Sequence, residues 1–162
     1  MGQGTEQIKN KIKALFPGLK NDSHFQLTSP YDPNYNCIAW AYGSYKDRWM
    51  WPPKGSPAYV LDAVTYWPNE NASENVEEFI HAFQEGKGYE VCKSADFENG
   101  FQKIALYVMK GTKKCTHAAR QLTTGFWTSK LGREQDIQHE TPYTIEGDIY
   151  GEVYCIMRRK FQ

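Results

Sequence analysis

The sequence predicts an α+β domain in which helices come first and an antiparallel sheet follows. Residues 5–16 and 73–85 carry apolar side chains at helical spacing. After residue 88 the chain consists of short runs rich in β-branched and aromatic residues, separated by Gly, Asn, Asp or Lys turns. Helical patterns followed by strand patterns are typical of α+β proteins and not of alternating α/β proteins.

The composition favours one domain. The chain has 162 residues, 40% of them hydrophobic and 15% aromatic, which suits a single substantial core. No internal repeat, low-complexity tract or linker interrupts it. We therefore predict one domain over 1–162, in which 1–30 form an N-terminal helix and a polar lead-in and 31–162 form the core.

The N-terminal half contains two short helical patterns and one irregular stretch. Residues 5–16 place Ile8, Ile12 and Leu15 on one face, and Pro17 ends the pattern. Residues 37–43 form an apolar segment that Asn36 is suited to cap. Residues 47–68 are rich in Trp, Tyr and Pro, and we expect this excursion to cover another part of the domain.

The C-terminal half begins with the clearest helix. Within 73–85 the apolar residues Val76, Phe79, Ile80 and Phe83 recur at i, i+3, i+4 and i+7. The following segments have strand character. They are 88–92, 103–109, 115–122, 126–131 and 148–159.

Charge and motifs exclude several function classes. Nineteen basic and nineteen acidic residues give zero formal charge, so neither nucleic acid nor an anionic membrane is favoured as a partner. No apolar run is long enough for a signal peptide or a membrane span, which predicts a cytoplasmic protein. The glycines form no nucleotide-binding motif, and the Cys115-x-His117 pair lacks further zinc ligands. We expect no cofactor and no metal.

Cys37 is the strongest candidate nucleophile. Four widely spaced cysteines are expected to be free thiols, and Cys37 alone begins a predicted helix. The helix macrodipole and unpaired backbone N–H groups there favour a thiolate and can hold an oxyanion. The alternative is that Cys37 is a small buried hydrophobic residue.

His117 is the candidate base, because it is the histidine that falls inside a predicted strand. If Thr123, Thr124 and Gly125 form a three-residue hairpin loop, Ser129 lies diagonal to His117 on the same face. A two-residue loop would bring Thr128 or Lys130 to that face instead. Ser129 is thus a candidate for orienting the imidazole. Asp136 is a second candidate, because it closely follows this strand and is expected to fold back over the site, although an exposed loop position is equally compatible with it.

Further residues have less specific expected roles. Asn34, Tyr35 and Asn36 precede Cys37 and are candidate donors to an oxyanion. Lys130 is a candidate for lowering the pKa of Cys37 or binding a substrate carboxylate, or else a strand-edge solubility lysine. Trp127 and four further tryptophans are expected either to line a groove or to fill the core. Those four are Trp40, Trp49, Trp51 and Trp67.

The motifs NCIAWA, HAARQL, WTSKLG and D-I-x-H resemble those of a family of bacterial and phage proteins without an assigned activity. The order of capping Cys, strand His and polar residue on the next strand resembles papain-like cysteine hydrolases, particularly the NlpC-like branch. That resemblance implies a papain-like fold with Cys37 as nucleophile and His117 as base. Ser129 departs from it, since that branch usually has His, Asn, Gln or Asp at the third position.

The sequence therefore predicts a cysteine hydrolase of the peptidase, amidase or deamidase class, with a peptide or protein as substrate. Two alternatives remain. One is a non-catalytic binding module of immunity or defence type on the same fold, and the other is an acyltransferase or deamidating effector that uses the same thiol. The sequence does not predict the oligomeric state.

Overall fold

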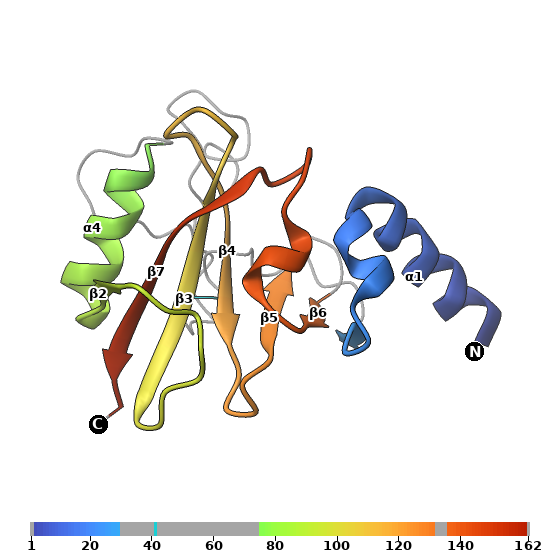
Figure 1. The fold of residues 1–162 in the computed structure, drawn as a ribbon, viewed down its shortest axis with the longest axis horizontal. Helices are drawn as coiled ribbons and strands as arrows, with labels where there is room; N and C mark the ends of the chain where they lie inside the picture. Colours follow the sequence, from blue (N-terminus) through green and yellow to red (C-terminus); the bar gives the residue numbers. More distant parts are fainter. Residues whose placement is uncertain (1, 30–40, 42–74, 132–135, 162) are drawn as a thin grey trace, which may run out of the picture.

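A computed structural model describes residues 2–29, 41, 75–131 and 136–161. The described elements combine helices with one antiparallel sheet, which confirms the predicted α+β class (Figure 1). They are, in chain order, α1 (Gly2–Leu15), η1 (Pro17–Asn21), β1 (Gln26–Ser29), α4 (Val76–Lys87), β2 (Glu90–Cys92), β3 (Phe101–Val108), β4 (Cys115–Gln121), β5 (Trp127–Lys130), β6 (Asp136–His139), η2 (Pro142–Ile145) and β7 (Glu152–Lys160).

The seven described strands lie in the order β1-β6-β5-β4-β3-β7-β2. Every neighbouring pair is antiparallel. Strands β3 to β6 follow one another as neighbours, as is usual for sequential antiparallel strands. The C-terminal β7 then returns to pair with β3 and separates it from β2. The long strands β3, β4 and β7 therefore lie in the interior of the sheet, whereas the short β1 and β2 form its edges.

Local signals account for the bounds of α4. Asn75 caps its N-terminus by accepting a hydrogen bond from the Glu77 backbone N–H at 2.9 Å. Gly88 ends it at φ +74°, a left-handed conformation that glycine adopts without a Cβ penalty. The predicted helix began at residue 73 and ended at 85, so the two caps move it by two or three residues.

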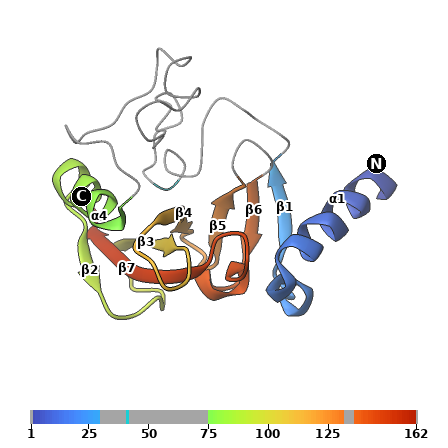
Figure 2. The same cartoon turned by 90° about the horizontal axis from the view of Figure 1, so that it is seen from above.

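The sheet is covered on both faces, and each face has its own apolar core. Figure 2 shows α4 on one face and the η2 segment on the other, with α1 beside the β1 edge. Apolar residues of α4 pack on alternate residues of β3, among them Ile104 and Leu106. Tyr107 and Ala105 belong to the opposite core, together with residues of α1, η1 and η2. We call these the α4 side and the η2 side of the sheet.

The β4–β5 hairpin has the register expected for a three-residue loop. The Leu122 N–H donates to the Phe126 carbonyl at 2.7 Å, and Gly125 adopts φ +93°. Arg120 lies opposite Thr128 on the paired strands. Continuing this register places His117 and Ser129 on the same face, as the three-residue loop predicts.

Four described elements were absent from the sequence prediction, namely η1, β1, β6 and η2. Residues 26–29, placed in the polar lead-in, form the edge strand β1, where Leu27 lies opposite Ile137 of β6. A stretch of four residues carries too little alternation to signal a strand, and its partner is more than a hundred residues away. The 3-10 helix η2 was also missed, although Thr141 caps it and Pro142 begins it.

Several predictions concern residues outside the described ranges. They include the 37–43 helix apart from Ala41, the 47–68 excursion, the nucleophile candidate Cys37, the oxyanion candidates Asn34, Tyr35 and Asn36, and the tryptophans Trp40, Trp49, Trp51 and Trp67. Ala41 itself is helical, 1% exposed, and belongs to the core on the α4 side. No helix within the described ranges is both long and apolar enough to cross a bilayer.

Candidate functional site

Three side chains from neighbouring strands form a buried hydrogen-bonded relay on the η2 side of the sheet. His117 on β4 lies with its Nε2 atom 3.0 Å from the Ser129 Oγ atom on β5. That Oγ atom lies 2.8 Å from Nε2 of His139 on β6. His139 Nδ1 lies 2.7 Å from the backbone carbonyl of Thr141. His117, Ser129 and His139 are all 0% exposed, and we call them the His–Ser–His relay.

The Thr141 carbonyl determines where the protons of the relay lie. A carbonyl oxygen only accepts, so His139 Nδ1 carries a proton, and in the neutral ring Nε2 is then an acceptor. The Ser129 hydroxyl must donate to His139 Nε2, and its oxygen therefore accepts from His117 Nε2–H. A neutral His117 is left with its lone pair on Nδ1. This atom is buried and has no hydrogen-bond partner among the described residues.

Burial keeps both imidazoles neutral. Burial lowers the pKa of His139 to about 4, and the hydrogen bond to Thr141 and the Asp22 carboxylate oppose the shift in part. Burial, and after it the neighbouring His139 ring, hold the pKa of His117 well below its ordinary value. The neutral tautomers derived from the hydrogen bonds are therefore the forms present near pH 7.

Two tyrosines enclose the His117 ring. Tyr150 stacks on it with ring centroids 4.0 Å apart and planes inclined by 7°. Tyr107 lies on β3 with its ring centroid 5.2 Å away, and its hydroxyl donates to the Pro142 carbonyl at 2.7 Å. Gly151 allows the chain after Tyr150 to approach β3, because a Cβ there would lie 1.9 Å from the Val108 carbonyl oxygen. The His117 ring is therefore held by aromatic packing as well as by the relay.

Lys130 and Asp136 lie on the other side of the sheet. They are directly opposite each other on β5 and β6, and Lys130 Nζ lies 3.8 Å from Asp136 Oδ1. Successive side chains of a strand point to opposite faces of the sheet, so the Lys130 side chain points away from the face that carries Ser129. Asp136 does not join the relay, which corrects the expectation that it folds back over His117 to orient it.

The solubility explanation of Lys130 is also wrong. Its side chain is 0% exposed, and β5 lies between β4 and β6 and is not an edge strand. The sequence left two alternatives for Trp127, a groove lining or the core. Its side chain is 1% exposed and packs in the core on the η2 side.

His139 completes the relay, and the sequence prediction left its role open. The D-I-Q-H segment contained a usable signal, because Ile137 and His139 are two residues apart and share a strand face. The missing information was the β5–β6 register, which places Trp127 opposite His139 and Ser129 opposite Ile137. Ser129 then lies diagonal to both histidines, within reach of each.

One cluster of potential metal ligands occurs among the described residues. One ligand atom each of Asp22, His24 and Glu140 lies within 4.8 Å of the others. The two Asp22 oxygens already accept hydrogen bonds from the backbone N–H groups of His24 and Glu140, at 2.9 and 2.8 Å. These bonds tie the chain before β1 to the end of β6, which explains the cluster without an ion.

Comparison with known proteins gives a family without an assigned activity. No curated protein and no solved structure matches the chain significantly. A family model described as a domain of unknown function, DUF7689, matches residues 26–158. The matched range begins with β1 and ends within β7, so it contains the other six described strands, most of β7 and the whole relay. The chain therefore belongs to the DUF7689 family.

Proposed function

We propose that the protein is a cysteine hydrolase that cleaves an amide or peptide-type bond, with Cys37 as nucleophile and His117 as base. The observation that carries the proposal is the lone pair on His117 Nδ1, a buried atom that the relay keeps unprotonated. A base that accepts a thiol proton needs such a nitrogen, oriented by a hydrogen bond at the other nitrogen of the ring.

The proposed reaction passes through an acyl-enzyme. His117 Nδ1 takes the Cys37 Sγ proton, and the thiolate attacks the carbonyl carbon to form a tetrahedral oxyanion. Backbone N–H groups at the N-terminus of the helix predicted for residues 37–43, or a side chain of Asn34, Tyr35 or Asn36, stabilise that oxyanion. Collapse releases the amine, which takes the proton from His117. Water then attacks the thioester and gives a proton to His117, and the carboxylic acid leaves as the thiol reforms.

Selective alkylation tests this proposal. We expect iodoacetamide near pH 7 to modify Cys37 faster than the other three thiols, as followed by peptide mass spectrometry. The three described cysteines, Cys92, Cys115 and Cys155, are free thiols, and the last two are poorly suited to react. Cys115 is 1% exposed, and burial raises the pKa of Cys155 to about 12.

The matched variants are His117→Ala and His81→Ala. His117→Ala should slow the alkylation of Cys37 by about tenfold or more, because the base is lost. His81 is exposed on α4, so its replacement should leave the rate unchanged. A folded protein in which Cys37 reacts no faster than Cys92 would contradict the proposal.

A second candidate is a non-catalytic binding module. It is favoured by the position of Ala41, four residues after Cys37, which packs on the α4 side, whereas the His117 ring lies on the η2 side. In that case the relay is structural, and His117→Ala lowers stability without changing the Cys37 alkylation rate. Measuring the unfolding free energy and the Cys37 alkylation rate of the His117→Ala variant therefore distinguishes the hydrolase from the binding module.

A further inference from the structure

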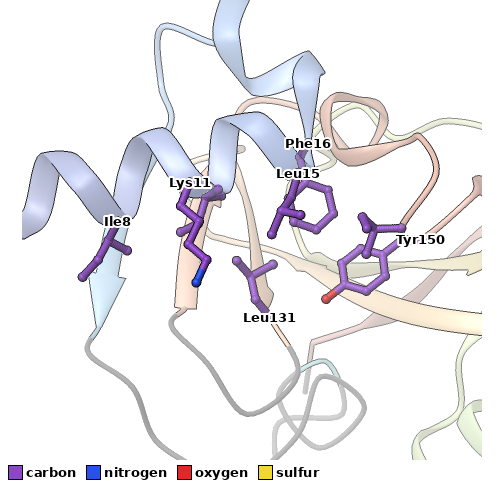
Figure 3. A pocket seen from close by; sticks show the side chains of 8 residues that line it. Ile8, Lys11, Leu15, Phe16, Leu131 and Tyr150 are labelled. Carbon is purple, nitrogen blue, oxygen red and sulfur yellow. The ribbon is translucent and has the colours of Figure 1, made fainter.

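A pocket of about 360 Å³ lies between α1 and the loop that leads into β7 (Figure 3). This volume is in the range of sites that hold small organic molecules. The lining is apolar apart from one ammonium and one phenol hydroxyl. It consists of Ile8, Lys11, Ile12, Leu15, Phe16, Leu131, Ile149 and Tyr150.

Large apolar side chains meet water around this pocket. Ile8 and Leu15 on α1 are 36% and 47% exposed, and Ile149 is 43% exposed. A single exposed apolar residue is ordinary, whereas three around one concavity form an apolar surface of the kind found at binding sites. A ligand with an apolar body would remove these surfaces from water on binding.

The polar groups of the pocket select the charge of the ligand. In Figure 3 the Lys11 ammonium and the Tyr150 hydroxyl flank Leu131. Two neighbouring lysines of α1 are engaged elsewhere, since Lys9 and Lys13 lie 5.8 and 5.9 Å from the centroid of the Phe25 ring. Lys11 is exposed and has no ion pair within the described part of the chain. An apolar wall with one cation, the Lys11 ammonium, complements an anionic head on an aliphatic body.

We propose that this pocket binds an aliphatic carboxylate of medium chain length. The chain lies against Ile8, Leu15 and Ile149, and the carboxylate pairs with Lys11. The proposal concerns a small-molecule site and requires no catalytic role for Cys37 or His117.

The wall formed by Tyr150 is preorganised. Its ring stacks on the buried His117, and its backbone carbonyl accepts a hydrogen bond from the Thr116 hydroxyl. Leu131, at the base of the pocket, is 8% exposed and belongs to the core on the η2 side. A rigid wall reduces the conformational entropy lost on binding.

Titration calorimetry of the full chain with octanoate, octanol and octylammonium tests the proposal. We expect octanoate to bind saturably with one site per chain and octylammonium to bind about tenfold more weakly or worse. Lys11→Met keeps the aliphatic stem and removes the charge. It should weaken octanoate binding by about tenfold and leave octanol binding unchanged.

Lys13→Met is the matched control, because Lys13 is on the same helix but lies over Phe25. It should leave octanoate binding unchanged, whereas Leu15→Asp, at an exposed pocket position, should abolish binding while the protein stays folded by circular dichroism. Absence of saturable octanoate binding would overturn the proposal. Equal losses in the two lysine variants, or equal affinities for octanoate and octylammonium, would also overturn it, since the pocket would then not select a carboxylate.

Discussion

At the scale of single residues, the Ser129 hydroxyl lies between the His117 and His139 rings and can donate only one hydrogen bond. Because the Thr141 carbonyl fixes the proton of His139, the Ser129 hydroxyl can satisfy both rings in one arrangement only. Ser129 therefore transmits a constraint from a backbone carbonyl to His117 Nδ1. In the proposed hydrolase it is a positioning residue and not a nucleophile.

The tautomers can be observed directly. We expect ¹⁵N-detected imidazole spectra near pH 7 to show His117 protonated at Nε2 and His139 protonated at Nδ1, because the hydrogen bonds require both. His81, which is exposed, should show averaged tautomers and serves as the internal reference. A proton on His117 Nδ1 would contradict the derivation.

Removing the hydroxyl should be costly. Ser129→Ala leaves His117 Nε2–H and His139 Nε2 buried without this partner, which predicts a loss of about 1–3 kcal/mol of unfolding free energy in urea. The exposed Ser23 makes only a 3.4 Å contact with His24, so Ser23→Ala should change stability by less than about 0.5 kcal/mol. Equal effects of the two variants would argue against a buried relay.

The pH dependence of stability follows from the same two histidines. In the unfolded chain each has a pKa near 6.5, whereas in the folded protein the pKa of His139 is about 4 and that of His117 is also lowered. Between these values the unfolded state binds more protons, so stability falls as the pH drops from about 6.5 towards 4. The urea midpoint should therefore be lower at pH 5.5 than at pH 7.5.

The variants His139→Gln and His81→Gln isolate this effect. The first should reduce the difference between the two midpoints, and the second should leave it as in the wild type, because His81 is exposed. A His139→Gln protein with the wild-type pH dependence would show that His139 is not buried in its neutral form.

At the scale of elements, strand alternation separates two polar groups that are neighbours in sequence. Ser129 lies in the relay on the η2 side, and Lys130 pairs with Asp136 on the α4 side. Both charged side chains are buried, with exposures of 0% and 2%. Removing one partner of a buried ion pair leaves the other charge desolvated and uncompensated.

A double-mutant cycle tests the energetic importance of this pair. Lys130→Met or Asp136→Asn alone should lower the unfolding free energy by about 3–5 kcal/mol, and the double variant should lose less than the sum of the two. The pair Lys113–Glu77 is the control, because it has the same 3.8 Å separation but exposures of 61% and 54%. Breaking it should change stability by less than about 1 kcal/mol. Additive losses at Lys130 and Asp136 would show that they do not interact.

At the scale of the whole molecule, the order of the strands determines which part opens last. Residues 103–108 of β3 are all buried, and β3 is paired on both sides. The edge strand β2 has three residues, and two of them are exposed. The central strands of the sheet are therefore more stable against local opening than its edge strands.

Native-state hydrogen exchange should reflect this order. We expect the slowest amides in β3 and the facing part of β4, with protection close to the global unfolding free energy, and the fastest strand amides in β1 and β2. The measurement is mass spectrometry or NMR under conditions where reclosing is faster than intrinsic exchange, so that protection reports the free energy of opening. Uniform protection across the sheet, or slower exchange at the edges, would contradict it.

Prediction from the sequence succeeded where the determinants are close together in the chain. The apolar spacing from Val76 to Phe83 predicted α4, and the turn residues around Gly125 narrowed the β4–β5 hairpin to two registers, of which the structure has the one with a three-residue loop. It failed for β1, whose four residues form a strand because β6 lies beside them. It also failed for Asp136, because its neighbours depend on the β5–β6 register.

The sequence by itself determined the α+β class and the α4 helix, and it narrowed the hairpin after His117 to two registers, since capping, periodicity and turn chemistry act over a few residues. The tertiary structure alone decided that His139 completes the relay, that Lys130 is buried with Asp136, and that α1 and Tyr150 enclose a pocket. Each of these depends on which distant segments pair as strands or pack on a given face of the sheet. Burial and long-range strand pairing, and not local propensity, determine these contacts.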